Sequence, residues 1–140
     1  MTDLREFRRA CHKAAGRVRA TVTGFRVSDG VTPNFHQGIL AFRDRTEIAV
    51  VLARDTGVAA LAEPRVISFA EATALESGPL TFVDHPELTV ALVETRAFRV
   101  MTTAELADPF DAREWPQLTE YDVRFWKPET LGDALFNYWD

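Results

Sequence analysis

The stretch Glu47–Glu63, EIAVVLARDTGVAALAE, decides the fold class of this chain. Its first half, residues 47–54, is apolar on both of its alternating faces, as in a central strand of a sheet. Asp55-Thr56-Gly57 then fits a three-residue hairpin loop with glycine at the left-handed position. The second half, Val58–Glu63, can return as the neighbouring strand, although its alanines and Leu61 also permit a helical turn. We therefore expect a sheet built outward from residues 47–54.

Alternating apolar residues indicate further strands on both sides of this hairpin. Residues 17–27 alternate, and the phase changes at Gly24, where we expect a bulge. Leu80–Val83 and Leu88–Phe98 fit two strands joined by a polar turn at Asp84–Glu87. The remaining strands are expected at residues 35–43 and 118–126. Most connections are shorter than the roughly twelve residues of a parallel crossover, so antiparallel pairing is expected.

Capping signals indicate helices at both ends of the chain and between the strands. Asp3 and Glu6 form a capping-box pattern before an amphipathic segment that Gly16 is placed to end. Later helices are indicated by the same box or by a leading proline: Ser68 with Glu71, Thr102 with Glu105, and Pro128 ahead of a segment that reaches Trp139. The sequence thus predicts one α+β domain over residues 1–140. It would hold a single antiparallel sheet of about six strands, with an N-terminal amphipathic helix, short internal helices and a C-terminal helix packed on one face.

Charge is distributed unevenly along the 140 residues. The formal net charge is −5, but residues 1–26 carry seven Lys and Arg against two acids, while residues 105–140 carry nine acids against three bases. A sequence pI of about 5.2 argues against a nucleic-acid-binding domain, for which a pI above roughly 9 is typical. We therefore expect the basic segment to meet acidic groups of a protein, either the chain's own C-terminal third or a partner.

Hydropathy and cysteine content favour a cytoplasmic protein with no membrane segment. The longest apolar run has six residues, Ile48–Ala53, whereas a bilayer span needs about 20. The first residues are charged without a following apolar segment, so no secretory signal is expected. The single cysteine, Cys11, cannot form an internal disulfide, which suits a reducing compartment.

The first helix carries the first candidate binding surface. Its apolar residues fall on one arc, and one continuous flank beside that arc is basic. The basic candidates for binding are Arg5, Arg8, Arg9 and Lys13.

The last expected helix carries the second candidate surface. Its apolar arc is wider than docking on the core requires, and Phe136 and Trp139 stand at one edge. We expect this edge to contact a protein partner or a second copy of the chain. The alternative is a covering layer, such as the loop that holds Trp115.

No residue pattern commits the chain to catalysis. The glycines form no phosphate loop or dinucleotide fingerprint, so no cofactor is expected. The three histidines lie in separate elements without ligand spacing, so no metal site is expected either. If the protein is an enzyme, Asp84 and His85 at the expected hairpin tip are the first nominees for an oriented base. Cys11 falls within the apolar arc, where cysteine packs as a small hydrophobe.

Two functions remain after these exclusions. The first is a small cytosolic non-enzymatic binding protein that acts through a protein–protein surface, such as an adaptor, a secretion-chaperone-like module or an immunity-type protein. The alternative is a small-molecule-binding protein or an enzyme that uses a pocket on the concave face of the sheet. His36, which shares a strand face with Leu40 and Phe42, and Tyr121 are the candidates to line that pocket.

Overall fold

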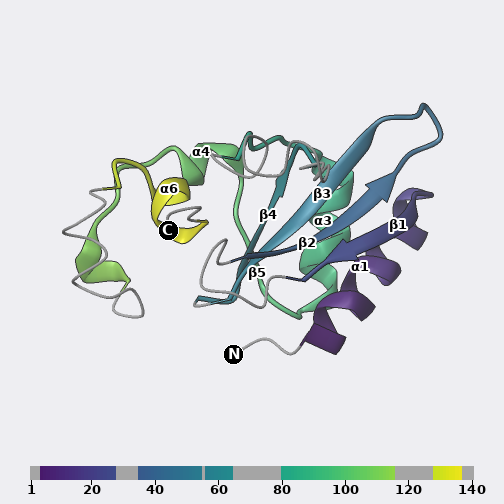
Figure 1. Ribbon diagram of the computed structural model, residues 1–140, viewed down its shortest axis with the longest axis horizontal. Coiled ribbons are helices and arrows are strands. Elements are labelled where there is room, and N and C mark those ends of the chain that lie inside the picture. The colour runs from purple at the N-terminus through teal and green to yellow at the C-terminus, as the bar shows by residue number, and fades with distance from the viewer. Residues whose placement is uncertain (1–3, 28–34, 55, 65–79, 116–127, 137–140) are drawn as a thin grey trace, which may run out of the picture.

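A computed structural model describes residues 4–27, 35–54, 56–64, 80–115 and 128–136. Within these residues the chain forms helices and strands in mixed order (Figure 1). The elements are α1 (Leu4–Val18), β1 (Thr21–Arg26), β2 (Phe35–Ala41), β3 (Glu47–Ala53), β4 (Val58–Ala62), α3 (Pro86–Thr95), β5 (Arg99–Val100), α4 (Thr103–Leu106), η1 (Ala112–Glu114) and α6 (Leu131–Leu135). The α+β class is therefore confirmed.

The sheet has five strands in the order β1-β2-β3-β4-β5. The first four pair antiparallel, whereas β5 pairs parallel with β4. The expected sheet of about six antiparallel strands is thus corrected, over the described residues, to a mixed sheet of five. The parallel pair forms because the chain between β4 and β5 includes helix α3 and is long enough for a crossover.

The stretch that decides the fold forms the two central strands. Every residue of 49–53 and 58–62 is buried, which confirms β3 and assigns Val58–Ala62 to a strand. Gly57 has a φ of 72°, as the left-handed position of the hairpin requires. On β1 the register shifts between Val22 and Gly24, which confirms the bulge.

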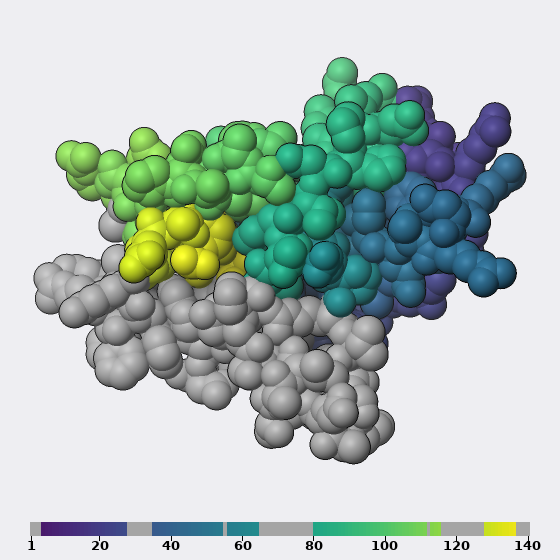
Figure 2. Space-filling model, turned by 90° about the horizontal axis from the view of Figure 1, so that it is seen from above, coloured from purple at the N-terminus to yellow at the C-terminus, as the bar shows by residue number. Residues whose placement is uncertain are grey.

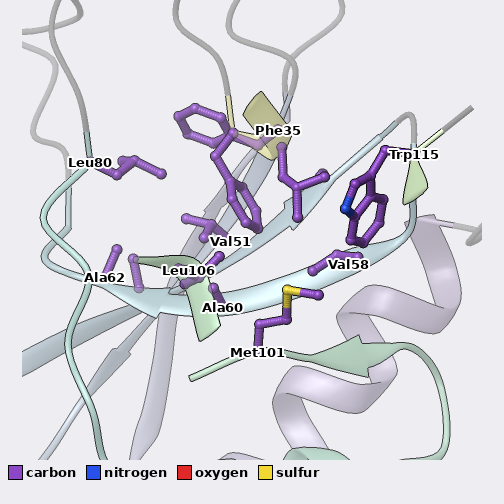
Figure 3. Packing of buried hydrophobic residues seen from close by; sticks show 13 residues of the cluster. Phe35, Val51, Val58, Ala60, Ala62, Leu80, Met101, Leu106 and Trp115 are labelled. Atoms are coloured by element: carbon purple, nitrogen blue, oxygen red, sulfur yellow. The ribbon is translucent and has the colours of Figure 1, made fainter. Parts of the chain in front are cut away.

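Each face of the sheet is covered by a different part of the chain. Because side chains alternate along a strand, Val50 and Leu52 of β3 pack with α1 and α3, while Val51 faces the opposite side. On that opposite side the strands pack against the segments around α4 and α6 (Figure 3). The residues that these segments and their neighbours contribute are Leu80, Met101, Leu106, Trp115, Leu135 and Phe136. The prediction of helices on one face alone is therefore wrong.

Most of the segment expected as the strand Leu88–Phe98 is helix α3, so the hairpin is not formed. Pro86 stands in the first turn, and Leu88, Ala91 and Leu92 are buried at helical spacing. Val90 on the outer face is 57% exposed. Apolar residues therefore occur on both the buried and the exposed face of the helix. For this reason the sequence lacks a clear helical pattern of apolar residues. Within the segment expected as Leu80–Val83, Phe82 forms a single antiparallel bridge to Ala62.

Helix α1 continues through Gly16, so the prediction that this glycine ends the helix is wrong. The left-handed position belongs instead to Arg19, with a φ of 59°, and the amide of Ala20 donates to the carbonyl of Ala15 at 2.8 Å. This is a Schellman ending. Val18 adds to the packing of the helix on the sheet. This partial burial of Val18 favours a helix that extends into residues that the alternating pattern assigns to a strand.

Two capping predictions can be compared with the structure. The Thr102–Glu105 capping box is formed and starts α4. The final helix begins later than expected, at Leu131 after the cap Thr130, because the Thr130 hydroxyl accepts from the amide of Asp133. The helix expected after Ser68 and the strand expected at 118–126 lie outside the described residues.

Helix α1 lies away from η1 and α6. α6 and η1 lie at one end of the long axis, and α1 lies at the other (Figures 1 and 2). Any contact of α1 with acidic groups of the same chain must therefore come from segments other than η1 and α6.

Candidate functional site

The basic residues of α1 divide between two sides of the helix. Successive residues turn by about 100°, so neighbours such as Arg8 and Arg9 point in different directions. Phe7 and Cys11 hold the helix on the sheet and are fully buried. On one side of this buried arc the helix borders α3, and on the other it borders β1.

A hollow of about 410 Å³ opens on the α3 side of α1. Three cations line it from successive turns of the helix, Arg5, Arg9 and Lys13, because residues four apart share one helix side. The other lining residues are Glu6 and Ala10 of α1, with Thr95 and Ala97 from the end of α3 and the chain after it. We call this surface the basic hollow. Three of the four basic residues predicted to bind thus meet at one place.

Two of the three cations of the basic hollow, Arg9 and Lys13, are uncompensated within the described chain. Arg9 and Lys13 are exposed and make no hydrogen bond or ion pair with any described residue. Cations spaced four apart repel one another, at about 0.2–0.5 kcal/mol per pair, and Arg5 stands near the positive end of the helix dipole. Glu6 supplies one negative charge. The arrangement is therefore one that an external anion would stabilise.

The side of the basic hollow opposite α1, formed by Thr95 and Ala97, could not be predicted from the sequence pattern. Thr95 and Ala97 belong to the segment expected as a strand, so their approach to α1 followed only from the helical structure of α3. The ion pair of Arg17 with Glu94 joins α1 to the end of α3. Within that end, the hydroxyl of Thr95 donates to the carbonyl of Leu92 at 2.6 Å.

The fourth basic residue, Arg8, lies on the opposite side of α1. Its guanidinium carbon stands 5.5 Å from the centroid of the Phe25 ring of β1, and the ring of His12 stands 5.7 Å from the same ring. A cation over an aromatic face is stabilised by the ring quadrupole. Arg8 therefore belongs to the surface beside β1.

Asp84 and His85 act as helix caps and do not contact each other as a pair. The carboxylate of Asp84 accepts from the amide of Thr103 at 3.1 Å and from its hydroxyl at 2.5 Å. These bonds lower the pKa of Asp84. Nδ1 of His85 accepts from the amide of Leu88 at 3.1 Å and so caps α3, while its ring stacks on Phe42 at 4.9 Å. The expected hairpin tip is thus a junction between two helix starts.

Two further candidates, Phe136 and His36, lie on faces of the sheet that other parts of the chain cover. Phe136 is 1% exposed and contacts the rings of Phe35 and Phe82. The covering layer is therefore formed at Phe136, which does not stand on an exposed edge.

His36 pairs in register with Leu52 on the face covered by α1 and α3. Burial, followed by the charge of Arg54, lowers the pKa of His36.

The thiol of Cys11 is held in the core, as predicted. It is fully buried between α1 and the sheet, and burial raises its pKa to about 12. A thiol that stays protonated is a poor nucleophile. The remaining candidates, Tyr121 and Trp139, lie outside the described residues.

No known protein family, no curated protein and no solved structure matches this chain. Across the described ranges, no cluster of three or more His, Cys, Asp or Glu side chains is arranged to hold a metal ion. None of the helices described is both long and apolar enough to cross a membrane. Function is therefore inferred from the chemistry of the basic hollow itself.

Proposed function

We propose that this chain is a small cytosolic, non-enzymatic binding protein whose basic hollow receives an acidic segment of a partner protein. The observation that carries the proposal is the convergence of Arg5, Arg9 and Lys13 on one hollow of about 410 Å³. Arg9 and Lys13 have no partner in the described chain. Carboxylates are the groups that would neutralise such cations and form charge-assisted hydrogen bonds with them.

The position of α1 favours a partner over the described acids of η1 and α6. The described acids of η1 and α6 lie at the opposite end of the molecule (Figure 1). A nucleic acid is a poorer fit, because the molecule as a whole carries a net charge of −5 and would repel a polyanion beyond the local patch. A short acidic peptide needs to satisfy only the local charges.

A small organic anion is the second candidate for the basic hollow. Its volume falls within the roughly 300–1,000 Å³ that is usual for small-molecule sites. Ala10 and Ala97 supply apolar wall beside the cations. The alternative pocket on the concave face of the sheet has less support, because both faces of the described sheet are covered by side chains of the chain itself.

Calorimetric titration with a capped hexaglutamate peptide tests the proposal. We expect binding at low ionic strength that weakens with added salt. The variant Arg9→Glu/Lys13→Glu should abolish it, because it reverses two of the three cations. Arg43→Glu/Arg45→Glu is the matched control, since both arginines are exposed in the turn between β2 and β3 and do not line the basic hollow.

The outcomes separate the candidates. Loss of binding in the double variant, with binding retained in the control, supports an acidic segment. If citrate binds more tightly than hexaglutamate and with the same dependence on Arg9, the site is one for small anions. If a single-stranded oligonucleotide binds at micromolar concentration in physiological salt, the proposal of a protein partner is wrong.

A further inference from the structure

The outer edge of β1 is the longer of the two edges of the sheet. β1 has six residues, and among the described elements its hydrogen-bonded neighbour is β2 alone. The opposite edge is formed by the two residues of β5, with the bridge of Phe82 to Ala62 beside it. In an antiparallel pair every second residue turns its amide and carbonyl outward, so β1 offers about three such residues to an added strand.

The surroundings of this edge are basic. Arg26 lies in β1 itself, and Arg19 lies two residues before the strand begins. From α1, Arg8 reaches over the ring of Phe25 at 5.5 Å. No acidic residue occurs from Arg19 to Val27.

Apolar side chains lie near these charges in the same segment of the chain. Val22 and Phe25 are partly buried and pack against the core beneath α1. Val27, directly after the strand, is 40% exposed. An incoming strand would therefore find the ring of Phe25 on the α1 side of the sheet and the charge of Arg26 on the other side. This arrangement favours an extended segment with apolar residues on one face and acidic residues on the other.

We propose that the outer edge of β1 binds an extended acidic segment of a partner protein as an added antiparallel or parallel strand. Backbone hydrogen bonds from β1 would hold the segment. Arg26 would pair with the carboxylates on its own face of the sheet, and Arg8 would add positive charge on the opposite face, beside Phe25. A second copy of this chain is a poor occupant. Pairing β1 with β1 antiparallel brings Arg19 of one copy toward Arg26 of the other, and like charges opposite one another are destabilising.

This surface is separate from the basic hollow. Arg8 lies on the β1 side of α1, whereas Arg9 lines the basic hollow on the α3 side. The two proposals therefore fail or succeed independently, and a backbone amide spectrum of the whole chain distinguishes them by position.

Amide exchange and chemical-shift mapping with a capped octapeptide of alternating valine and glutamate test the inference. We expect shift changes and slower exchange at amides of Thr21–Arg26. The same peptide with lysine in place of glutamate should leave these amides unchanged. Arg8→Glu/Arg26→Glu should weaken the acidic peptide by about tenfold or more. Arg113→Glu, in η1 and away from this edge (Figure 1), is the control for a charge reversal elsewhere in the molecule and should bind as the unmodified chain does.

The peptide pair keeps the test valid even if the double variant does not fold, because the unmodified chain alone gives the comparison. Equal effects of the acidic and basic peptides would overturn the proposal. Absence of protection in β1 would also overturn it, and the bulge and arginines would then serve only to block association at this edge. Shift changes confined to Ala10, Thr95 and Ala97 would place the acidic peptide in the basic hollow and would refute strand addition.

Discussion

Replacing Gly16 with alanine separates the observed end of α1 from the one that the sequence suggests. If Gly16 were the left-handed cap, a Cβ there would be strained and the variant would lose stability. In the structure Gly16 lies inside the helix, and a Cβ added there meets no atom within 4 Å. Alanine is favoured over glycine in a helix interior by up to about 1 kcal/mol. Near the helix end we expect a gain of about 0.5–1 kcal/mol, or a melting temperature about 2–5 °C higher.

Gly38→Ala is the contrasting variant in this experiment. Its Cβ would stand 3.0 Å from Cε1 of Phe25 and 3.1 Å from the sulfur of Cys11. Cys11 is fully buried, and the Phe25 ring is held between Phe7 and Arg8. Neither neighbour can move freely, so we expect a loss of about 1–3 kcal/mol from overpacking.

Urea denaturation and thermal melts of both variants measure these differences. The reasoning about α1 requires opposite signs, with Gly16→Ala more stable and Gly38→Ala less stable than the unmodified chain. A lower melting temperature for Gly16→Ala would show that α1 ends at Gly16 after all. A neutral Gly38→Ala would show that α1 does not approach β2 as closely as described.

Three further predictions follow from buried or capping groups. Because the pKa of Cys11 is raised from 9.0 to about 12, the thiol should label slowly in native buffer and rapidly in urea. The unfolded chain ionises first, so the free energy of unfolding should fall as pH rises from about 9 toward 12, as pH-dependent urea titrations would show. His85→Ala should cost about 0.5–2 kcal/mol by removing the cap of α3, and His85→Asn should recover part of it; equal losses in urea melts would refute the capping role. Phe136→Ala should cost about 3–5 kcal/mol without a change in sedimentation, whereas a stable variant with lost self-association would restore the interface hypothesis.

The parts of the fold that the sequence predicted depend on local patterns. The apolar run at 47–54, the glycine of the hairpin at 57 and the phase change at Gly24 each correspond to a feature of the structure. The capping box of Thr102 and Glu105 is of the same kind, since its bonds lie within four residues. Such patterns are reliable because the physical cause and the residues that report it are adjacent in the chain.

The parts that the sequence did not predict depend on long-range packing. Val90 and Val93 gave α3 a strand-like composition although its buried face has helical spacing. Once α3 was assigned to a hairpin, the parallel pairing of β5 could not be anticipated. Gly16 resembles a helix end, but the packing of the partly buried Val18 against the sheet extends the helix past it. In each case tertiary contacts outweigh a local preference of about 1 kcal/mol.

The candidate surfaces also depend on long-range packing, as two neighbouring residues, Arg8 and Arg9, show. The sequence places Arg8 and Arg9 on one basic flank, because a helix in isolation has no neighbours to divide that flank. Packing supplies the division: β1 lies on one side of α1 with Phe25 beneath Arg8, and the end of α3 lies on the other side with Thr95 opposite Arg9. Charge reversal at Arg8 should therefore weaken strand addition at β1. Charge reversal at Arg9 should weaken binding in the basic hollow. Two adjacent arginines with separable effects are a consequence of the three-dimensional structure that no charge pattern along the chain contains.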